Sequence, residues 1–133
     1  MTTEEARREA ARLWLEKSAE SQSAGRVVLS TSPAIAVARA YYACFYAACA
    51  VLILEDRRFV RHSGVRTALH KYLVQTGRLS QSLGKAYDEL MTSRHQADYE
   101  TAQWTQEQAR KALDISDQIV AALKAIIPSD FTK

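Results

Sequence analysis

The sequence predicts an all-α protein, an up-and-down bundle of four to five helices. Long stretches carry apolar residues at helical spacing, and no stretch alternates apolar and polar residues as a strand does. Only four Gly and two Pro interrupt the 133 residues, and short connections between long helices make neighbours antiparallel. A chain of this length builds one hydrophobic core, so we expect residues 1–133 to form one domain.

The first helix is predicted from residue 2 to about residue 30. Thr2 and Glu5 have the spacing of a capping box, and no proline follows before position 33. Ser18, Ser21 and Gly25 form a stripe of small residues on this helix. Because small side chains let two backbones come near each other, we expect another helix to pack closely along this stripe.

The second helix begins at Ser32 and Pro33, an N-cap residue followed by the first helical position. From there to Leu54 its only charge is Arg39, so nearly every side is apolar. The uninterrupted part, residues 40–54, is shorter than the about 20 residues that cross a membrane. We therefore expect a central core helix that a second copy of the chain also covers, and no membrane span.

Three further helices complete the prediction. The third follows a basic loop and ends at Gly77, and the fourth runs from about residue 80 to residue 97. The fifth opens at Thr105, with Gln108 completing a capping box, and ends at Pro128. The N-terminal residues do not have the pattern of a secretory signal, and the two cysteines are interpreted as buried free thiols, so the expected location is the cytoplasm.

The charge of the chain is unevenly distributed. No acidic residue lies between Asp56 and Asp88, whereas seven cationic residues do: Arg57, Arg58, Arg61, Arg66, Lys71, Arg78 and Lys85. Such a segment favours a face that attracts phosphate or an acidic partner. We take Arg57, Arg58, Arg61, His62 and Arg66 as candidate ligand-binding residues.

The stretch "SRHQADYE" at residues 93–100 concentrates polar side chains near the end of the fourth helix. Arg94 lies four residues before Asp98, and His95 lies four residues before Tyr99, so each pair shares a helix stripe. Two interpretations stay open: an exposed ion pair of little energetic weight, or a site where Arg94 stabilises phosphate charge while His95 or Tyr99 handles a proton.

His62 has two interpretations as well. With its neighbouring arginines it could hold an anion at the start of the third helix, or it could belong to a plain capping turn. The three histidines lack the paired spacing of a metal site, and no nucleotide-binding glycine loop or hydrolase motif is present. We therefore expect neither a metal nor a cofactor.

Four segments in this order resemble the HEPN domain, in its small stand-alone bacterial and archaeal branch. They are "AVARAYYACFYAACAVL" at 36–52, "RHSGVRTAL" at 61–69, "TGRL" at 76–79 and the 93–100 stretch. The resemblance implies a helical bundle that forms a homodimer. It also implies a gene pair with a small nucleotidyltransferase, of the toxin-antitoxin or a related type.

Ribonucleases that resemble this fold carry an arginine followed, after four to six residues, by a histidine. Arg94 matches the arginine, but Tyr99, Glu100 and Thr101 stand where the histidine is expected, and His95 is adjacent to the arginine. A phenol with a pKa near 10 is a poor base at neutral pH, so Tyr99 does not readily replace an imidazole. Tyr99 is instead a candidate for modification by a partner nucleotidyltransferase.

Three functions follow from these observations. The preferred one is a binding module that docks nucleotide, RNA or a nucleotidyltransferase through its basic loop and the Arg94 stripe, with Asp98 among the binding residues. The second is a metal-independent endoribonuclease toxin that uses Arg94 with His95 or Tyr99. The third is a structural interaction protein whose arginines only keep it soluble.

Overall fold

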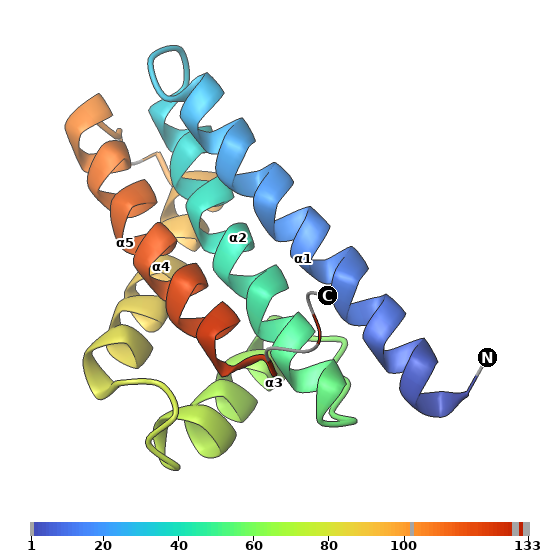
Figure 1. The fold of residues 1–133 in the computed structure, drawn as a ribbon. Coiled ribbons are helices and arrows are strands. Elements are labelled where there is room, and N and C mark those ends of the chain that lie inside the picture. The colour runs from blue at the N-terminus through green and yellow to red at the C-terminus, as the bar shows by residue number, and fades with distance from the viewer. Residues whose placement is uncertain (1, 102, 129–130, 132–133) are drawn as a thin grey trace.

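The computed structural model describes residues 2–101, 103–128 and 131. Within these residues the chain forms five α-helices and one π-helical turn, and no strand. They are α1 (Thr3–Val28), α2 (Pro33–Leu54), α3 (His62–Ala68), the π-helical η1 (Leu69–Val74), α4 (Gln81–Tyr99) and α5 (Gln106–Ile126). The four long helices run up and down, and α3 with η1 lies at one end of the bundle (Figure 1). The predicted fold class is confirmed.

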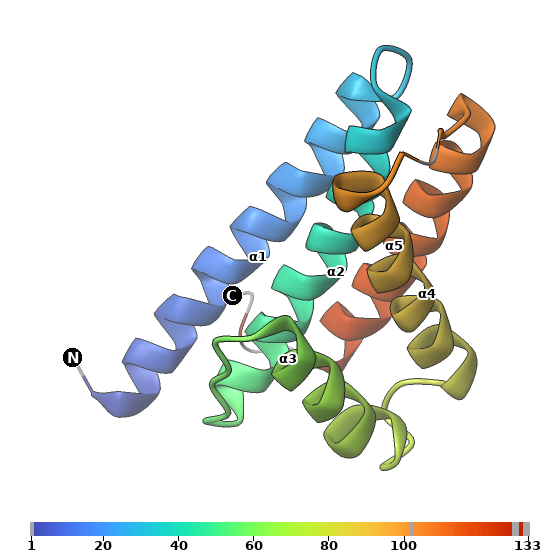
Figure 2. The ribbon, with the colours of Figure 1, turned by 180° about the vertical axis from the view of Figure 1, so that it is seen from behind.

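Helices α1 and α2 lie side by side and antiparallel along most of their length (Figures 1 and 2). The small-residue stripe of α1 makes this contact, as the sequence predicts. The Ser18 hydroxyl donates to the Ala43 carbonyl at 2.7 Å, and the Ser21 hydroxyl donates to the Arg39 carbonyl at 2.9 Å. A Cβ on Gly25 would lie 2.6 Å from Cδ2 of Leu113, so no larger residue fits there without movement.

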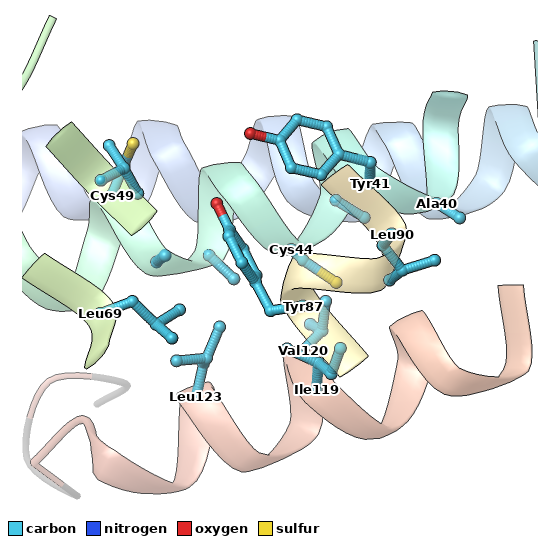
Figure 3. Packing of buried hydrophobic residues seen from close by; sticks show 14 of the residues in the cluster. Ala40, Tyr41, Cys44, Cys49, Leu69, Tyr87, Leu90, Ile119, Val120 and Leu123 are labelled. Carbon is cyan, nitrogen blue, oxygen red and sulfur yellow. The ribbon is translucent and has the colours of Figure 1, made fainter. Parts of the chain in front are cut away.

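Helix α2 is the core helix of the bundle, flanked by α1, α4 and α5 (Figure 2). By length and composition it would pass for a membrane span, yet 72% of its most apolar window is buried within the chain. Figure 3 shows Tyr41 and Cys44 of α2 packed in this core with Tyr87 of α4. Cys44 and Cys49 are buried free thiols, and burial raises the pKa of each to about 12.

The third predicted helix is not uniform. It begins as α3 and widens into the π-helical turn η1 before Gly77, which has a φ of +80° and ends it as predicted. The turn packs against Gly84 of α4, where a Cβ would lie 2.8 Å from Cγ2 of Val74 and 3.2 Å from Cε1 of His70. A wide turn needs such a gap in the facing helix, and π-helical turns are frequent near functional sites.

Candidate functional site

Arg94 is a buried cation on α4, with 8% of its surface exposed. Its guanidinium carbon lies 5.2 Å from the Tyr41 ring centroid and 5.7 Å from that of Tyr42, distances typical of cation-π contacts. The ion pair with Asp98 exists, but it is long, at 3.7 Å. The interpretation as an exposed ion pair is therefore wrong, because this arginine faces the core.

The guanidinium of Arg94 has a buried hydrogen-bond donor without an acceptor in the described part of the chain. Its Nε is buried and has no hydrogen-bond partner among the residues that the structure describes. Tyr87, Leu90 and Arg94 are spaced three and four residues apart and are all buried, so Arg94 continues the core-facing stripe of α4. This spacing is the sequence signal from which its burial could have been predicted.

His62, at the first position of α3, turns toward the same aromatic residues. Its Nδ1 shares a 2.8 Å hydrogen bond with the Tyr41 hydroxyl, and its ring centroid lies 4.3 Å from that of Phe45. Burial lowers the pKa of His62, and the charge of Arg94 lowers it further. The pKa of Tyr41 rises to about 12, chiefly through burial. The pair is therefore neutral at pH 7.

The structure thus brings together Arg94 and His62, which the sequence suggested for separate sites. The aromatic residues between them were not among the candidates. The signal for them was the "RAYYACFY" run, in which Tyr41, Tyr42 and Phe45 contact His62 of α3 or Tyr87 of α4, whereas Tyr46 stacks on Trp14 of α1.

An open hollow of about 390 Å³ lies beside Arg94 on the surface of α4 and α3. Arg66 and His95 also line it, with Asp88, Met91 and Thr92. We call this feature the Arg94 hollow. Its guanidinium and imidazole groups supply hydrogen-bond donors of the kind that hold phosphate or carboxylate oxygens.

Asp88 anchors the cationic wall of the hollow. It accepts hydrogen bonds from Nε of Arg66 at 2.8 Å and is within 2.9 Å of Nε2 of His70. Partial burial alone would raise the pKa of Asp88, but the contacts with Arg66 and His70 outweigh it and hold the pKa below its usual value. The sequence contained no signal for this carboxylate.

His95 and Tyr99 lie on the outer side of the same helix. Their ring centroids are 5.1 Å apart, and Tyr99 is 70% exposed. His95 follows Arg94 directly and points about 100° away from it around the helix axis, yet both residues border the hollow. Tyr99 is not one of the residues that line it.

The basic segment does not form one face of seven free cations. Arg66 is paired with Asp88, and Arg78 is paired with Glu55 at 2.6 Å, so neither of these two is a free cation. Arg57 and Arg58 line an apolar pocket that shares no lining residue with the Arg94 hollow.

Three other cations of the basic segment stay exposed. They are Arg61, Lys71 and Lys85, and none forms an ion pair with a described residue. In the described part of the chain, no three His, Cys, Asp or Glu side chains gather as metal ligands would.

Comparison with known proteins shows which family the chain belongs to. The model of the HEPN domain matches residues 9–126. A UPF0332 protein of Thermotoga maritima is 32% identical over 93 residues, which are 69% of this chain and 70% of the relative. A protein of Methanocaldococcus jannaschii named "Putative toxin" is 35% identical over 96 residues, 69% of this chain and 72% of the relative.

A solved structure shares the fold. The crystal structure of a Thermus thermophilus protein superposes with a TM-score of 0.75 at 21% identity, over 88% of this chain and 98% of that one. The family match spans nearly all of the bundle, from the first half of α1 to the end of α5, and it includes every residue of the Arg94 hollow. The chain belongs to the HEPN domain family.

Proposed function

We propose that this HEPN protein is a cytoplasmic binding module that holds a phosphate group of RNA or of a nucleotide in the Arg94 hollow. One observation carries the proposal: Arg66, Arg94 and His95 border a single open hollow, and Nε of Arg94 lacks a hydrogen-bond partner in the described part of the chain. A buried cation without full satisfaction is costly, and an anionic oxygen in the hollow would add a charge-assisted contact to the Arg94 guanidinium.

The surroundings support phosphate over a less charged ligand. Arg61, Lys71 and Lys85 of the basic segment are exposed, and such cations add attraction for a nucleic-acid backbone that weakens as salt rises.

Binding of a short single-stranded RNA at low salt tests this proposal. We expect Arg94→Met to weaken binding at least about tenfold, the loss of one charge-assisted contact. Lys111→Gln, which removes an exposed cation of α5 outside the hollow, is the matched control and should change affinity little. Equal binding by the wild type and Arg94→Met would contradict the proposal.

We also propose that the chain works in a toxin-antitoxin-like pair with a nucleotidyltransferase. The relative named "Putative toxin" supports the type of system, and the 70% exposure of Tyr99 leaves its hydroxyl accessible for modification. After co-expression with a neighbouring transferase, intact-mass analysis should find an adduct on the peptide that contains Tyr99. An unmodified peptide from an active transferase would count against it.

A homodimer is the assembly that we propose for this module. Tyr42, Phe45 and Tyr46 are half-buried on one side of α2 and pack against one another. A second copy of the chain would complete their burial. Sedimentation at micromolar concentration should give a dimer, and Phe45→Glu should shift it to a monomer. A wild-type monomer would exclude this assembly.

An endoribonuclease toxin is the second candidate, because His95 borders the same hollow as Arg94. In that case Arg94 would stabilise the phosphate and His95 would move the proton. The enzyme should then degrade RNA in the presence of a chelator, and both Arg94→Ala and His95→Ala should abolish the activity. If RNA is bound and stays intact, the binding module is the correct assignment.

A further inference from the structure

A second cavity lies between the first half of α1, the second half of α2 and the loop that joins α2 to α3. Its volume is about 280 Å³, near the lower end of the range for small-molecule sites. Trp14 of α1 and the buried Leu52, Ile53 and Cys49 of α2 line it. We call it the Trp14 pocket. It shares no lining residue with the Arg94 hollow, so it is separate from the proposed phosphate site.

The loop over the pocket is shaped by one residue in the left-handed region. Asp56 has a φ of 60°, and the following amide, of Arg57, donates to the Leu52 carbonyl at 2.9 Å. The chain reverses at this turn, and residues 57–60 become part of the pocket wall. Phe59 is 39% exposed and Val60 is 99% exposed, so apolar side chains stand open to water at the pocket mouth.

The charge at the pocket is positive. Arg57 and Arg58 are the charged residues that line it. The two carboxylates that precede them in the sequence have other partners: Glu55 pairs with Arg78, and Asp56 lies 3.8 Å from Arg7. Among the residues that the structure describes, the pocket therefore combines an apolar interior with a cationic edge, and neither Arg57 nor Arg58 forms an ion pair with a carboxylate.

Arg57 is held against an aromatic ring, and its guanidinium is only partly hydrogen-bonded. Its guanidinium carbon lies 3.4 Å from the Tyr72 ring centroid, which fixes the group in place. Its Nε is buried, yet no described residue accepts a hydrogen bond from it. Buried donors are normally satisfied, so the described chain leaves this part of the Arg57 guanidinium without full hydrogen bonding.

We propose that the Trp14 pocket binds a medium-chain aliphatic carboxylate, with octanoate as its representative. The apolar chain would lie against Trp14, Leu52 and Ile53, and Phe59 and Val60 would cover it. The carboxylate would accept hydrogen bonds from the guanidinium groups of Arg57 and Arg58. A neutral molecule of the same length would gain only the apolar contacts and would bind more weakly.

Fluorescence of Trp14 offers a direct test, because bromine quenches an indole only in contact. The probe is octanoate with bromine at the chain end, used on Trp104→Phe protein, in which Trp14 is the remaining tryptophan. Quenching should saturate with a Kd at or below about 1 mM, and unlabelled octanoate should reverse it. The Trp14→Phe protein, which keeps Trp104 outside the pocket, should show no saturable quenching.

Variants test separately the contact with the carboxylate and the contact with the apolar chain. Arg58→Gln, at an exposed position, should weaken octanoate binding about tenfold and leave binding of octanol unchanged. Ala10→Phe should fill the pocket and abolish binding, whereas Ala19→Phe, on the same helix at an exposed position outside the pocket, should not. Circular dichroism checks that each variant folds.

Several results would overturn the proposal. One is the absence of saturable quenching up to millimolar probe. Another is octanol binding as tight as octanoate binding with no effect of Arg58→Gln, since the cations would then have no role. Quenching that persists in Ala10→Phe would place the ligand elsewhere. None of these results bears on RNA binding at the Arg94 hollow.

Discussion

The α1 side of α2 and the α4 side of α2 bury polar groups in opposite ways. On the α1 side, the Ser18 and Ser21 hydroxyls both find backbone carbonyls of α2, and Gly25 leaves no free space. On the α4 side, Arg94 is buried with one long ion pair and an unsatisfied Nε within the described chain. Full hydrogen bonding stabilises the first region, and the second keeps a buried donor without a described partner, beside the hollow that we propose as the phosphate site.

The largest expected effect lies on the tightly packed side. Leu113→Ala removes the fully buried side chain that faces Gly25 and should lower the free energy of unfolding by about 2–5 kcal/mol. Gly25→Ala alone should cost about 1–3 kcal/mol through overpacking. Urea unfolding measures both changes.

The double variant sharpens this test. In the Leu113→Ala background, Gly25→Ala should cost less than it does alone, because the side chain nearest the new Cβ is gone. Ser23→Ala, an exposed change on the same helix, is the control and should alter stability by no more than about 0.5 kcal/mol. Additive costs would show that the close packing at Gly25 is not the cause.

On the α4 side, replacement of Arg94 should not lower the free energy of unfolding and could raise it. Arg94→Met replaces an incompletely satisfied buried cation with an apolar side chain of similar length, so stability should stay unchanged or rise by up to about 2 kcal/mol. The same variant should lose RNA affinity. Urea unfolding and RNA titration of one preparation check the two effects together. A large loss of stability would mean that Arg94 is a structural residue.

A smaller effect concerns the protonation of His62. Burial and the charge of Arg94 both lower its pKa, so neutral His62 contributes stability above pH 6.5 that is lost as the pH falls below the unfolded value. In Arg94→Met the pKa should rise toward 6.5 but stay below it, because burial is the larger cause. NMR titration of the His62 ring protons, assigned with His62→Gln, measures the change; an unchanged pKa would contradict the coupling.

The smallest expected effect concerns Asp88 in acid. Its lowered pKa means that the carboxylate contributes stability above the unfolded value of about 3.9, and this contribution is lost as the pH falls through the folded value. Asp88→Asn should therefore be less stable than wild type at neutral pH, and the difference should shrink below about pH 4. Unfolding curves at both pH values test this. A constant difference would exclude the ionic contribution.

The sequence alone was enough to predict the bundle and its core helix. Apolar spacing, the Thr105 and Gln108 capping box and the turn at Gly77 are local signals, and each is found in the structure. The close packing along the small-residue stripe of α1 was also predicted, because Ser and Gly on one side of a helix let a neighbouring backbone approach closely.

The grouping of site residues depended on the tertiary structure. Charge in the sequence suggested one basic face, but an ion pair between α3 and α4 joins Arg66 to Asp88, and the reversal at Asp56 carries Arg57 and Arg58 to a separate pocket. These contacts join residues that are distant in the sequence, or they follow from one backbone angle, so no local pattern encodes them. The sequence by itself determined which segments are helical and which helix is central; packing decided which charges are buried, paired or free, because that depends on what each side chain meets across the bundle.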